Sequence, residues 1–449
     1  MIDNDTRRRP WIRGIGVVAS VFSAVALAAC GQPAESEGGD SLTIQSGIAG
    51  FGAFEFAYED VVEAFQKANP DIDVKYTART FEEMLNVGRL QLTGNAPPDV
   101  LQVNGGYESF GAFAGSGLLV PLEDYSAEYG WEERVPENFL DLNARFSDDG
   151  TKMGSGTLWG MSTSAFWVSL WMNMDVAAEL GIEEAPESLA ELEEQLQTAK
   201  DGGVVPFQLG TADGAQTAWM LTNLMLATSG PDAVNDVVFH EEGASFEEDP
   251  GREAATLFQD WAESGYFTPD WTAYTNDDAF RSFLDGNGLF TLNGTWQLPF
   301  QDGPKDSIRV MTFPSDDPDQ LAALQSGDVP WVIPAASENH DLAAKFLDFL
   351  VSDEAQEIFL ENGILPAVPV DGMEDTLADL GFGQTMVDSA MWNARVVEEG
   401  GAVPYIDWAA PGLLDSIHSG MDELGAGRIT PEEFTQRLQS TYETALTGK

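Results

Sequence analysis

The alternation of strand-like and helix-like segments between residues 41 and 103 restricts the possible folds more than any other feature of the sequence. These segments read strand, helix, strand, helix, strand, over residues 41–45, 55–69, 72–76, 80–92 and 99–103. Thr80 is the expected N-cap of the second helix. Short connections between such segments predict an α/β fold with a mainly parallel, helix-flanked sheet. Ligands of these sheets bind at the carboxyl ends of the strands, here after Gln45 and Val103.

The N-terminal thirty residues have the pattern of an export signal. A basic stretch ending at Arg13 precedes sixteen uncharged residues, 14–29, which are too few for a confident membrane span. The run ends in Leu-Ala-Ala-Cys-Gly at 27–31, which resembles the lipobox of bacterial lipoproteins. We therefore expect a signal peptide over 1–29, a lipidated Cys30 and a flexible tether over 30–40. The alternative is that Cys30 is a buried structural cysteine.

The export route is left open by the same segment. The sequence Arg-Arg-Pro-Trp-Ile-Arg at 8–13 also resembles a twin-arginine signal, although Arg7 stands where Ser or Thr is usual. The remaining chain has no stretch long and apolar enough to span a bilayer. The expected location is the outer face of the cytoplasmic membrane, where the lipid holds the protein.

Composition excludes several classes of function. With 75 Asp+Glu and 21 Lys+Arg, the formal charge of -54 repels nucleic acids. A single cysteine excludes intrachain disulfides, Cys-based zinc sites and iron–sulfur clusters, and three scattered histidines leave little for a metal site. The glycine loop at 47–52 has the spacing G-x-x-G-x-G and is not followed by the Lys-Ser or Lys-Thr of a nucleotide loop. We expect no cofactor.

The acidic excess itself has two interpretations. The acids are scattered at helix-surface spacing, which favours a solvated surface adapted to salt. Attraction to a cationic ligand or metal is the other interpretation.

Nine segments carry a family resemblance, in this order: 64–74 (AFQKANPDIDV), 94–100 (GNAPPDV), 117–122 (GLLVPL), 158–161 (LWGM), 171–175 (WMNMD), 283–286 (FLDG), 292–296 (LNGTW), 344–350 (AKFLDFL) and 363–366 (GILP). Together they resemble the extracellular solute-binding proteins of carbohydrate-type ABC importers, family 1, which are similar to maltose-binding protein. The matches run from about residue 42 to the C-terminus. Departures are Met161, Met172 and Met174, where the family usually has Pro, Tyr and Lys.

This resemblance implies a periplasmic-binding-protein-like fold of two α/β lobes with three chain crossings. The crossings are expected near 159–163, 283–291 and 328–334. The expected N-terminal lobe is then 41–160 plus 290–328, and the expected C-terminal lobe is 161–289 plus 333–449. Such a protein, a monomer that is not an enzyme, captures a mono- or oligosaccharide by hinge closure and delivers it to an ABC transporter permease.

Aromatic and polar residues supply the expected binding site. One face of a pyranose is apolar and packs on aromatic rings, while its hydroxyls bind polar side chains. By resemblance, Trp296, Trp408 and Trp219 are the stacking positions. Further candidates follow from their place in loops and crossings: Phe54, Glu82, Asn104, Tyr107, Phe166, Trp167, Tyr405 and Asp407. Only one of Phe166 and Trp167 can face the cleft, because neighbours on a strand point oppositely.

Four other tryptophans are expected in the core or on the surface and not in the binding site: Trp131, Trp261, Trp271 and Trp392.

Two other functions remain open. The same architecture binds polyamines or ferric iron in some proteins, and Glu55, Glu82, Glu108 and Asp407 offer acids for a cation. A secreted glycoside hydrolase needs two carboxylates about 5–10 Å apart, but no hydrolase signature is present in the sequence.

Overall fold

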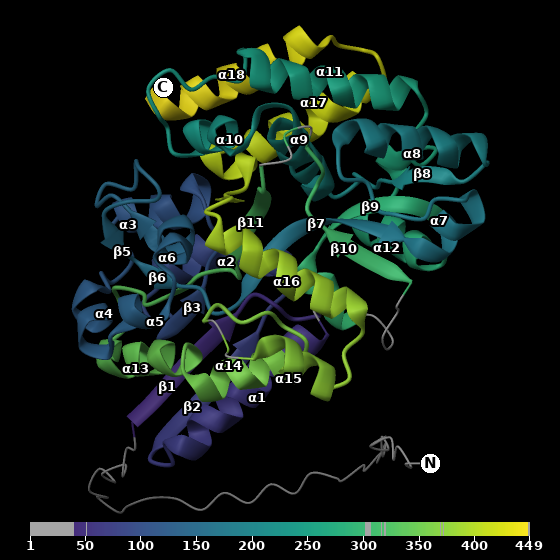
Figure 1. Ribbon diagram of the computed structural model, residues 1–449. Helices are drawn as coiled ribbons and strands as arrows, with labels where there is room; N and C mark the ends of the chain where they lie inside the picture. The colour runs from purple at the N-terminus through teal and green to yellow at the C-terminus, as the bar shows by residue number, and fades with distance from the viewer. Residues whose placement is uncertain are drawn as a thin grey trace, which may run out of the picture. The chain divides into compact units, whose positions relative to one another are not determined.

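Two β-sheets organise the computed structural model of the chain (Figure 1), which describes residues 40–447 apart from 51, 301–306, 316, 318, 319, 369 and 371. The expected signal segment and Cys30 lie outside the described residues. The first sheet has the order β2-β1-β3-β12-β6, with strands at Asp40–Ser46 (β1), Ile72–Ala78 (β2), Val100–Gln102 (β3), Gly160–Met161 (β6) and Trp331–Val332 (β12). β1 runs parallel to β2 and β3, and β12 runs antiparallel to β3 and β6. The predicted strand–helix alternation is confirmed.

Helices and a small hairpin surround the first sheet: α1 (Ala53–Ala68), α2 (Phe81–Leu92), the π-helix η1 (Tyr107–Gly111), α3 (Ala112–Gly115), α4 (Glu123–Tyr129), α5 (Trp131–Arg134), α6 (Glu137–Ala144), β4 (Arg145–Phe146), β5 (Thr157–Leu158), α13 (His340–Leu350) and α14 (Asp353–Glu361). Thr80 caps α2 as predicted, in a capping box with Glu83. The apolar face of α1 packs on α13 through an edge-to-face contact of Phe65 and Phe346.

The second sheet has the order β13-β11-β7-β9-β8, and β10 also pairs with β7. Its strands are β7 (Ala165–Asn173), β8 (Val205–Gln208), β9 (Gly288–Gly294), β10 (Ile308–Met311), β11 (Ala323–Gly327) and β13 (Ala402–Val403). β8 is parallel to β9 and β11 to β13, whereas β7 is antiparallel to β9, β10 and β11. This sheet is therefore mixed and not mainly parallel as expected, because the long central strand β7 runs against each of its neighbours.

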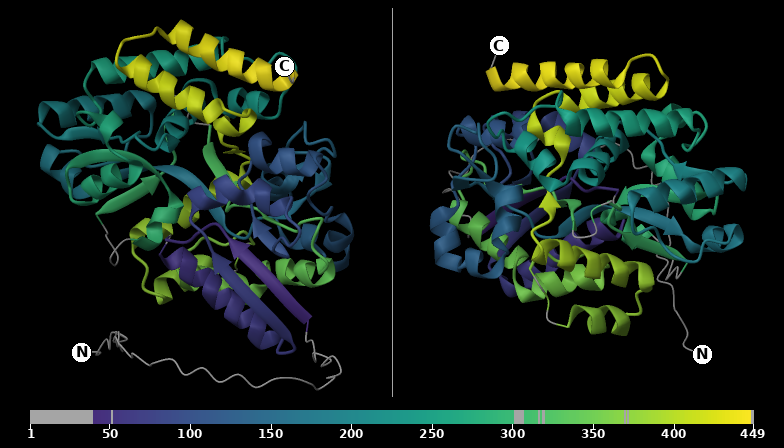
Figure 2. Two further views of the ribbon diagram at one scale, coloured as in Figure 1. Left: turned by 180° about the vertical axis from the view of Figure 1, so that it is seen from behind. Right: turned by 45° about the horizontal axis from the view of Figure 1, so that its top comes forward.

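The second sheet carries α7 (Met174–Leu180), α8 (Leu189–Asp201), α9 (Ala215–Ser229), α10 (Pro231–Val238), α11 (Asp249–Glu263), η2 (Trp271–Ala273), α12 (Asn276–Leu284), η3 (Thr295–Phe300), α15 (Met373–Asp379), α16 (Gln384–Glu398), η4 (Ile406–Ala409), α17 (Leu413–Gly425) and α18 (Pro431–Thr447). α9 is buried on nearly all sides and packs against α10, α11 and α17. The helices α11, α17 and α18 lie side by side at one end of this part of the chain (Figure 2). An all-round apolar helix such as α9 needs this cover.

The chain crosses between the two sheets at three places. The first crossing, 162–164, joins β6 to β7, and the second, 328–330, joins β11 to β12. The third follows Pro366, which bridges to Ser164 of the first crossing. The first lobe is accordingly 40–161 plus 331–366, and the second is 165–327 plus 373–447.

The crossing expected near 283–291 is wrong. β9 continues from α12 within the second sheet, where it pairs with both β7 and β8. Residues 290–328 thus belong to the second lobe, not the first, while α13 and α14 pack on α1 and belong to the first. The expectation failed because residues 288–294 form a strand that pairs within the second sheet, so the chain does not change lobe there.

Candidate functional site

Four aromatic rings form a continuous row from the first lobe into the second. Phe54, at the start of α1, lies 5.0 Å from Phe166 of β7 between ring centroids. Phe166 lies 5.6 Å from Trp296 in η3, and Trp296 lies 5.2 Å from Trp219 in α9. All four were predicted site residues, and the structure brings them together. We call this set the aromatic row.

Trp296 has the most distinctive packing in the aromatic row. A Cβ atom at position 294 would lie 2.1 Å from its ring, so only glycine lets the indole lie across the end of β9. Trp296 remains half-buried, whereas Phe54 and Trp219 are buried. Trp296 and Phe166 are therefore the members of the row with surface left for a ligand.

A second aromatic group joins the lobes at η4. The rings of Tyr405 and Trp408 lie 5.0 Å apart. The indole of Trp408 covers Gly105 and Gly106 of the first lobe, where added Cβ atoms would come within 2.6 and 2.7 Å of it. Gly106 has a positive φ of 74° as well, so glycine is required there twice over. Trp408 thus lies on the loop after β3, next to the predicted Asn104.

Two predicted polar residues lie on the segments that meet at Trp408. Asp407 precedes Trp408 in the chain, and Asn104 precedes Gly105, which the ring covers. Burial, with a smaller contribution from the charge of Glu108, raises the pKa of Asp407 to about 6. Asn104 is half-buried, and its side chain has no hydrogen-bond partner among the residues that the structure describes. An amide and a carboxyl on the two segments that meet at this indole offer the donors and acceptors that a polyhydroxylated ligand needs.

Tyr107 takes part in a contact between the two lobes. Its ring stacks on His240 of the second lobe at 4.1 Å with an interplanar angle of 14°, and its hydroxyl accepts the backbone N–H of Met153 at 3.0 Å. An ion pair of 3.1 Å between Lys152 and Glu241 lies beside this contact. Tyr107 therefore packs between the lobes. The contact with His240 was not predicted from the sequence. His240 has a left-handed φ of 54°, and no local sequence pattern indicates this conformation.

Trp167 and Glu82 are the two predicted site residues that the structure separates from the aromatic groups. Trp167 is completely buried, and its indole N–H donates to Ser389 at 3.1 Å, so it is a core residue. Its neighbour Phe166 points the other way, as strand geometry requires. Glu82 is an exposed residue in the first turn of α2.

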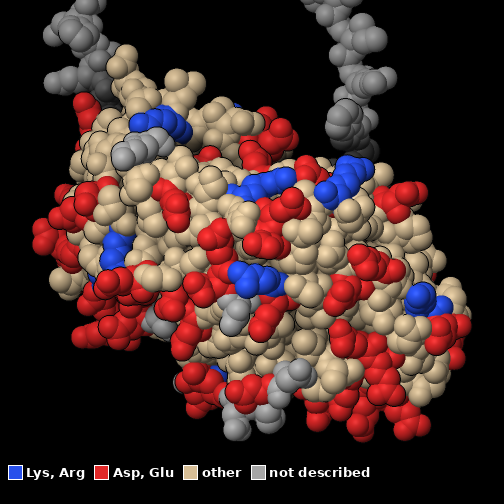
Figure 3. All heavy atoms as spheres, turned by 90° about the horizontal axis from the view of Figure 1, so that it is seen from above, with Lys and Arg blue, Asp and Glu red and all other residues tan. Residues whose placement is uncertain are grey.

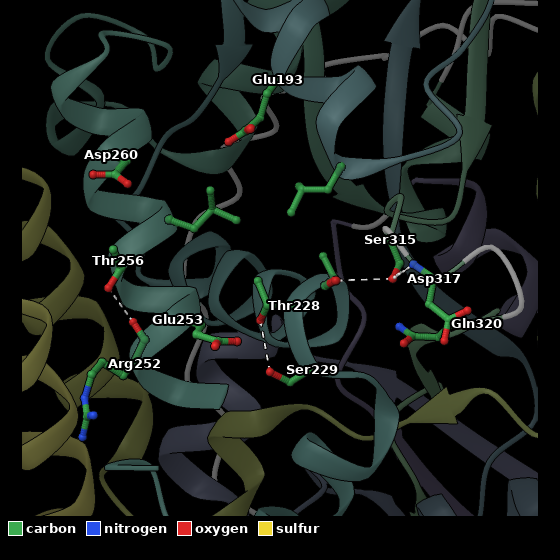
Figure 4. A pocket seen from close by; sticks show the side chains of 13 residues that line it. Glu193, Thr228, Ser229, Arg252, Glu253, Thr256, Asp260, Ser315, Asp317 and Gln320 are labelled. Atoms are coloured by element: carbon green, nitrogen blue, oxygen red, sulfur yellow. Dashed lines mark hydrogen bonds between the residues drawn. The ribbon is translucent and has the colours of Figure 1, made fainter. Parts of the chain in front are cut away.

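A hollow of about 800 Å³ lies elsewhere in the second lobe (Figure 4). It is lined by α8, α9 and α11 and by Ser315, Asp317 and Gln320, and its labelled side chains include Glu193, Glu253 and Asp260. No predicted site residue lines it. Among the described residues, no group of His, Cys, Asp and Glu side chains is placed to hold a metal ion.

Acidic side chains spread over the face seen in Figure 3, with few basic residues among them. On this face they are scattered and do not form a single patch, which fits the solvated-surface interpretation of the charge. Within the residues that the structure describes, no helix has both the length and the apolar character to cross a membrane.

Two lobes joined by three crossings, with aromatic groups between them, define a class of protein that encloses small solutes. The family of bacterial extracellular solute-binding proteins matches residues 52–357. The chain belongs to this family, whose members are binding proteins and not enzymes.

Named relatives agree with this assignment. A maltooligosaccharide ABC transporter solute-binding lipoprotein of Streptococcus pneumoniae serotype 4 is 24% identical over 365 residues, covering 76% of this chain and 77% of its own. The maltodextrin-binding protein MdxE of Bacillus subtilis is 21% identical over 368 residues, covering 78% and 79%. The GacH receptor of Streptomyces glaucescens, solved unliganded and with acarbose, is similar in fold, with a TM-score of 0.71, 20% identity and coverage of 92% and 99%.

Proposed function

We propose that this chain captures a sugar between its two lobes and presents it to the permease of an ABC transporter. The observation that carries the proposal is the aromatic row, which runs from α1 of the first lobe to α9 of the second. Trp296 and Phe166 both belong to the second lobe. A sugar ring packed on them would gain contacts from the first lobe as well only when the two lobes approach each other, so binding would select the closed form.

Further support comes from the relatives. Two of them are named for maltooligosaccharide or maltodextrin binding, and a chitin oligosaccharide binding protein has a TM-score of 0.73 with 19% identity over 91% of this chain and 99% of its own. Oligosaccharides present repeated apolar faces, which suits two aromatic groups, the aromatic row and the Tyr405–Trp408 pair. We therefore place a sugar of one or more units at these groups, with Asn104 and Asp407 binding hydroxyls.

Attachment to the membrane is part of the proposal. Cys30 would carry the lipid, and residues 30–39 would tether the body to the outer face of the cytoplasmic membrane. A single copy of the chain would then meet the permease with its loaded, closed lobes. The sequence pattern at 7–31 and the name of the lipoprotein relative support the lipid attachment.

A thermal-shift screen of the full chain tests the ligand class. Maltooligosaccharides, chitin oligosaccharides and monosaccharides are compared with spermidine, putrescine and ferric citrate at equal concentrations. A sugar that raises the Tm, confirmed by calorimetric titration, is the expected result, since a ligand that binds only the folded state stabilises it. A response to polyamine or iron alone would contradict the sugar assignment.

A further inference from the structure

A buried polar cluster lies where the three crossings meet. Ser162, Thr163 and Ser164 of the first crossing and Asp328 of the second are at most 1% exposed. The third crossing joins them through its backbone, because the N–H of Ala367 donates to the carbonyl of Thr163 at 3.3 Å. Buried polar groups are expensive unless they are hydrogen-bonded, so a polar hinge of this kind is held in one arrangement by its bonds.

Asp328 is the centre of the cluster. Its Oδ1 accepts the backbone N–H groups of Thr163 at 2.6 Å and Ser164 at 3.4 Å. Its Oδ2 accepts the hydroxyl of Thr163 at 2.9 Å, the hydroxyl of Tyr58, and the side-chain amide of Gln102 at 3.5 Å. One carboxylate thus connects both crossings to α1 and β3 of the first lobe.

The same carboxylate is linked to the aromatic row from two directions. Tyr58 lies one helical turn after Phe54 on α1, and their rings are 5.3 Å apart. On the other side, Ser164 is two residues before Phe166 at the start of β7. Asp328 is thus connected, through Tyr58 and through Ser164, to Phe54 and Phe166, the two rings that meet across the lobes.

We propose that Asp328 is a positioning residue for solute capture: its carboxylate fixes the relative arrangement of the lobes, and uptake of a proton by Asp328 shifts that arrangement. The effect on binding rests on the proposed function; the effect on the lobes does not. A carboxylate accepts from every donor around it, whereas the neutral acid must donate one hydrogen. On protonation, the hydroxyl of Tyr58 or Thr163 has to turn from donor to acceptor.

The carboxyl of Asp328 takes up its proton at a pH that can be reached with the folded chain. Burial raises the pKa of Asp328 to about 6, against the lowering effect of its hydrogen bonds from Tyr58, Thr163 and Ser164. Tyr58 is the titratable side chain that the described contacts place against it, and burial raises the pKa of Tyr58 well above its ordinary value. Asp328 is therefore the group of this cluster that changes charge between pH 5 and 7.5.

Distance measurements between spin labels test the proposal without any solute. The full chain with Cys30→Ser carries labels at Leu90→Cys of α2 and Leu446→Cys of α18, which are 72% and 49% exposed and lie in different lobes. The expected result is a distance distribution that shifts between pH 7.5 and 5. Asp328→Asn, which resembles the neutral acid, should show the low-pH distribution at both pH values.

Three further variants make the outcome specific. Asp99→Asn removes another buried acid of the first lobe, bonded to Thr43 and Ser337 and outside the crossings, and should keep the full response. His240→Gln, at the other interlobe contact, should keep it too. Tyr58→Phe is a milder change that can be used if Asp328→Asn does not fold. It removes a hydrogen bond to the charged carboxylate of Asp328, so the midpoint of the pH-dependent distance change should move to higher pH.

A distribution that does not change with pH, or a response that survives in Asp328→Asn, would overturn the inference. Neither result depends on the identity of the ligand, so the proposed function would still stand. Conversely, failure of every sugar in the binding screen would leave the pH response of the lobes intact.

Discussion

Trp296 and Trp408 are the residues on which the proposed sugar site depends most. Both are half-buried, and both lie on glycines that no other residue could replace without a clash. Large aromatic groups in such positions dominate binding, and truncation of one commonly costs about 2–4 kcal/mol. These are also the residues that family resemblance singled out from the sequence.

Trp296→Ala and Trp408→Ala should each weaken sugar affinity by roughly 30- to 1,000-fold, because each removes a platform for the sugar ring. Calorimetric titration with the best sugar of the screen measures this, and the Tm without ligand should change much less. Trp392→Ala, at a tryptophan under Arg395 on α16, is the matched control and should leave affinity unchanged. Equal affinity in all three variants would place the site elsewhere.

Asp328 gives a prediction for stability as well as for hinge motion. Its pKa is raised to about 6 in the folded chain, above the value of about 3.9 for an unfolded Asp, so the folded state binds the proton more tightly. The resulting stability is fully present below pH 4 and is lost as the pH rises through 6. By linkage this loss amounts to about 3 kcal/mol at neutral pH.

Asp328→Asn removes that titration. The Tm of the variant relative to the original chain should therefore rise between pH 4 and 6 and stay level above, as followed by thermal melts at half-unit steps of pH. Asp99→Asn should stay level over this range, because hydrogen bonds from Ser337, Thr43 and Asn339 lower the pKa of Asp99 despite its burial. Its Tm relative to the original chain should rise only as the pH falls below about 4, where the original chain loses the stability of the charged Asp99. A constant difference between Asp328→Asn and the original chain over this range would contradict the assignment.

At the scale of elements, local sequence signals predicted the first half of the first lobe correctly. Periodicity and an N-cap are short-range properties, and β1, α1, β2, α2 and β3 were all anticipated, together with Thr80 as the N-cap of α2. The crossing assigned to 283–291 failed because the pairing of β9 with β7 joins residues 118 to 126 positions apart. No local pattern states which sheet a strand enters.

In the site, too, features with a local sequence pattern were predicted and contacts between distant segments were not. Trp219 and Trp296 were predicted from the family resemblance and Phe166 from its place near the first crossing, and the three rings lie together. The contact of Tyr107 with His240 and the cluster around Asp328 depend on segments that meet only in the folded chain. The sequence could not say which of Phe166 and Trp167 faces the cleft, because that depends on which face of β7 packs on the core.

At the scale of the whole molecule, charge is the dominant property. The 21 Lys+Arg side chains cannot pair with 75 Asp+Glu, and the acids repel one another over the surface seen in Figure 3. Raising the salt from about 0.01 M to about 1 M shortens the Debye length from roughly 30 Å to 3 Å. The Tm should therefore rise over this range in scanning calorimetry, and a flat or falling Tm would count against a salt-adapted surface.

Anchoring is a second property of the whole chain. Cys30→Ser removes the acceptor of the lipid, so we expect the protein in the medium or as an uncleaved precursor instead of in the membrane fraction. Immunoblots of medium, membrane and cytosol fractions, with metabolic labelling by a fatty acid, measure this. A processed, membrane-bound Cys30→Ser chain would show that the cysteine is not the anchor.

Closure of the two lobes on a sugar is the central claim, and the distance between the labels at Leu90→Cys and Leu446→Cys tests it most directly. At pH 7.5, adding the sugar with the strongest response in the screen should change the distance distribution to a single narrower population. Trp296→Ala should show this change only at roughly 30-fold or higher sugar concentration. A distribution that saturating sugar leaves unchanged, while calorimetry shows the sugar bound, would contradict capture by closure.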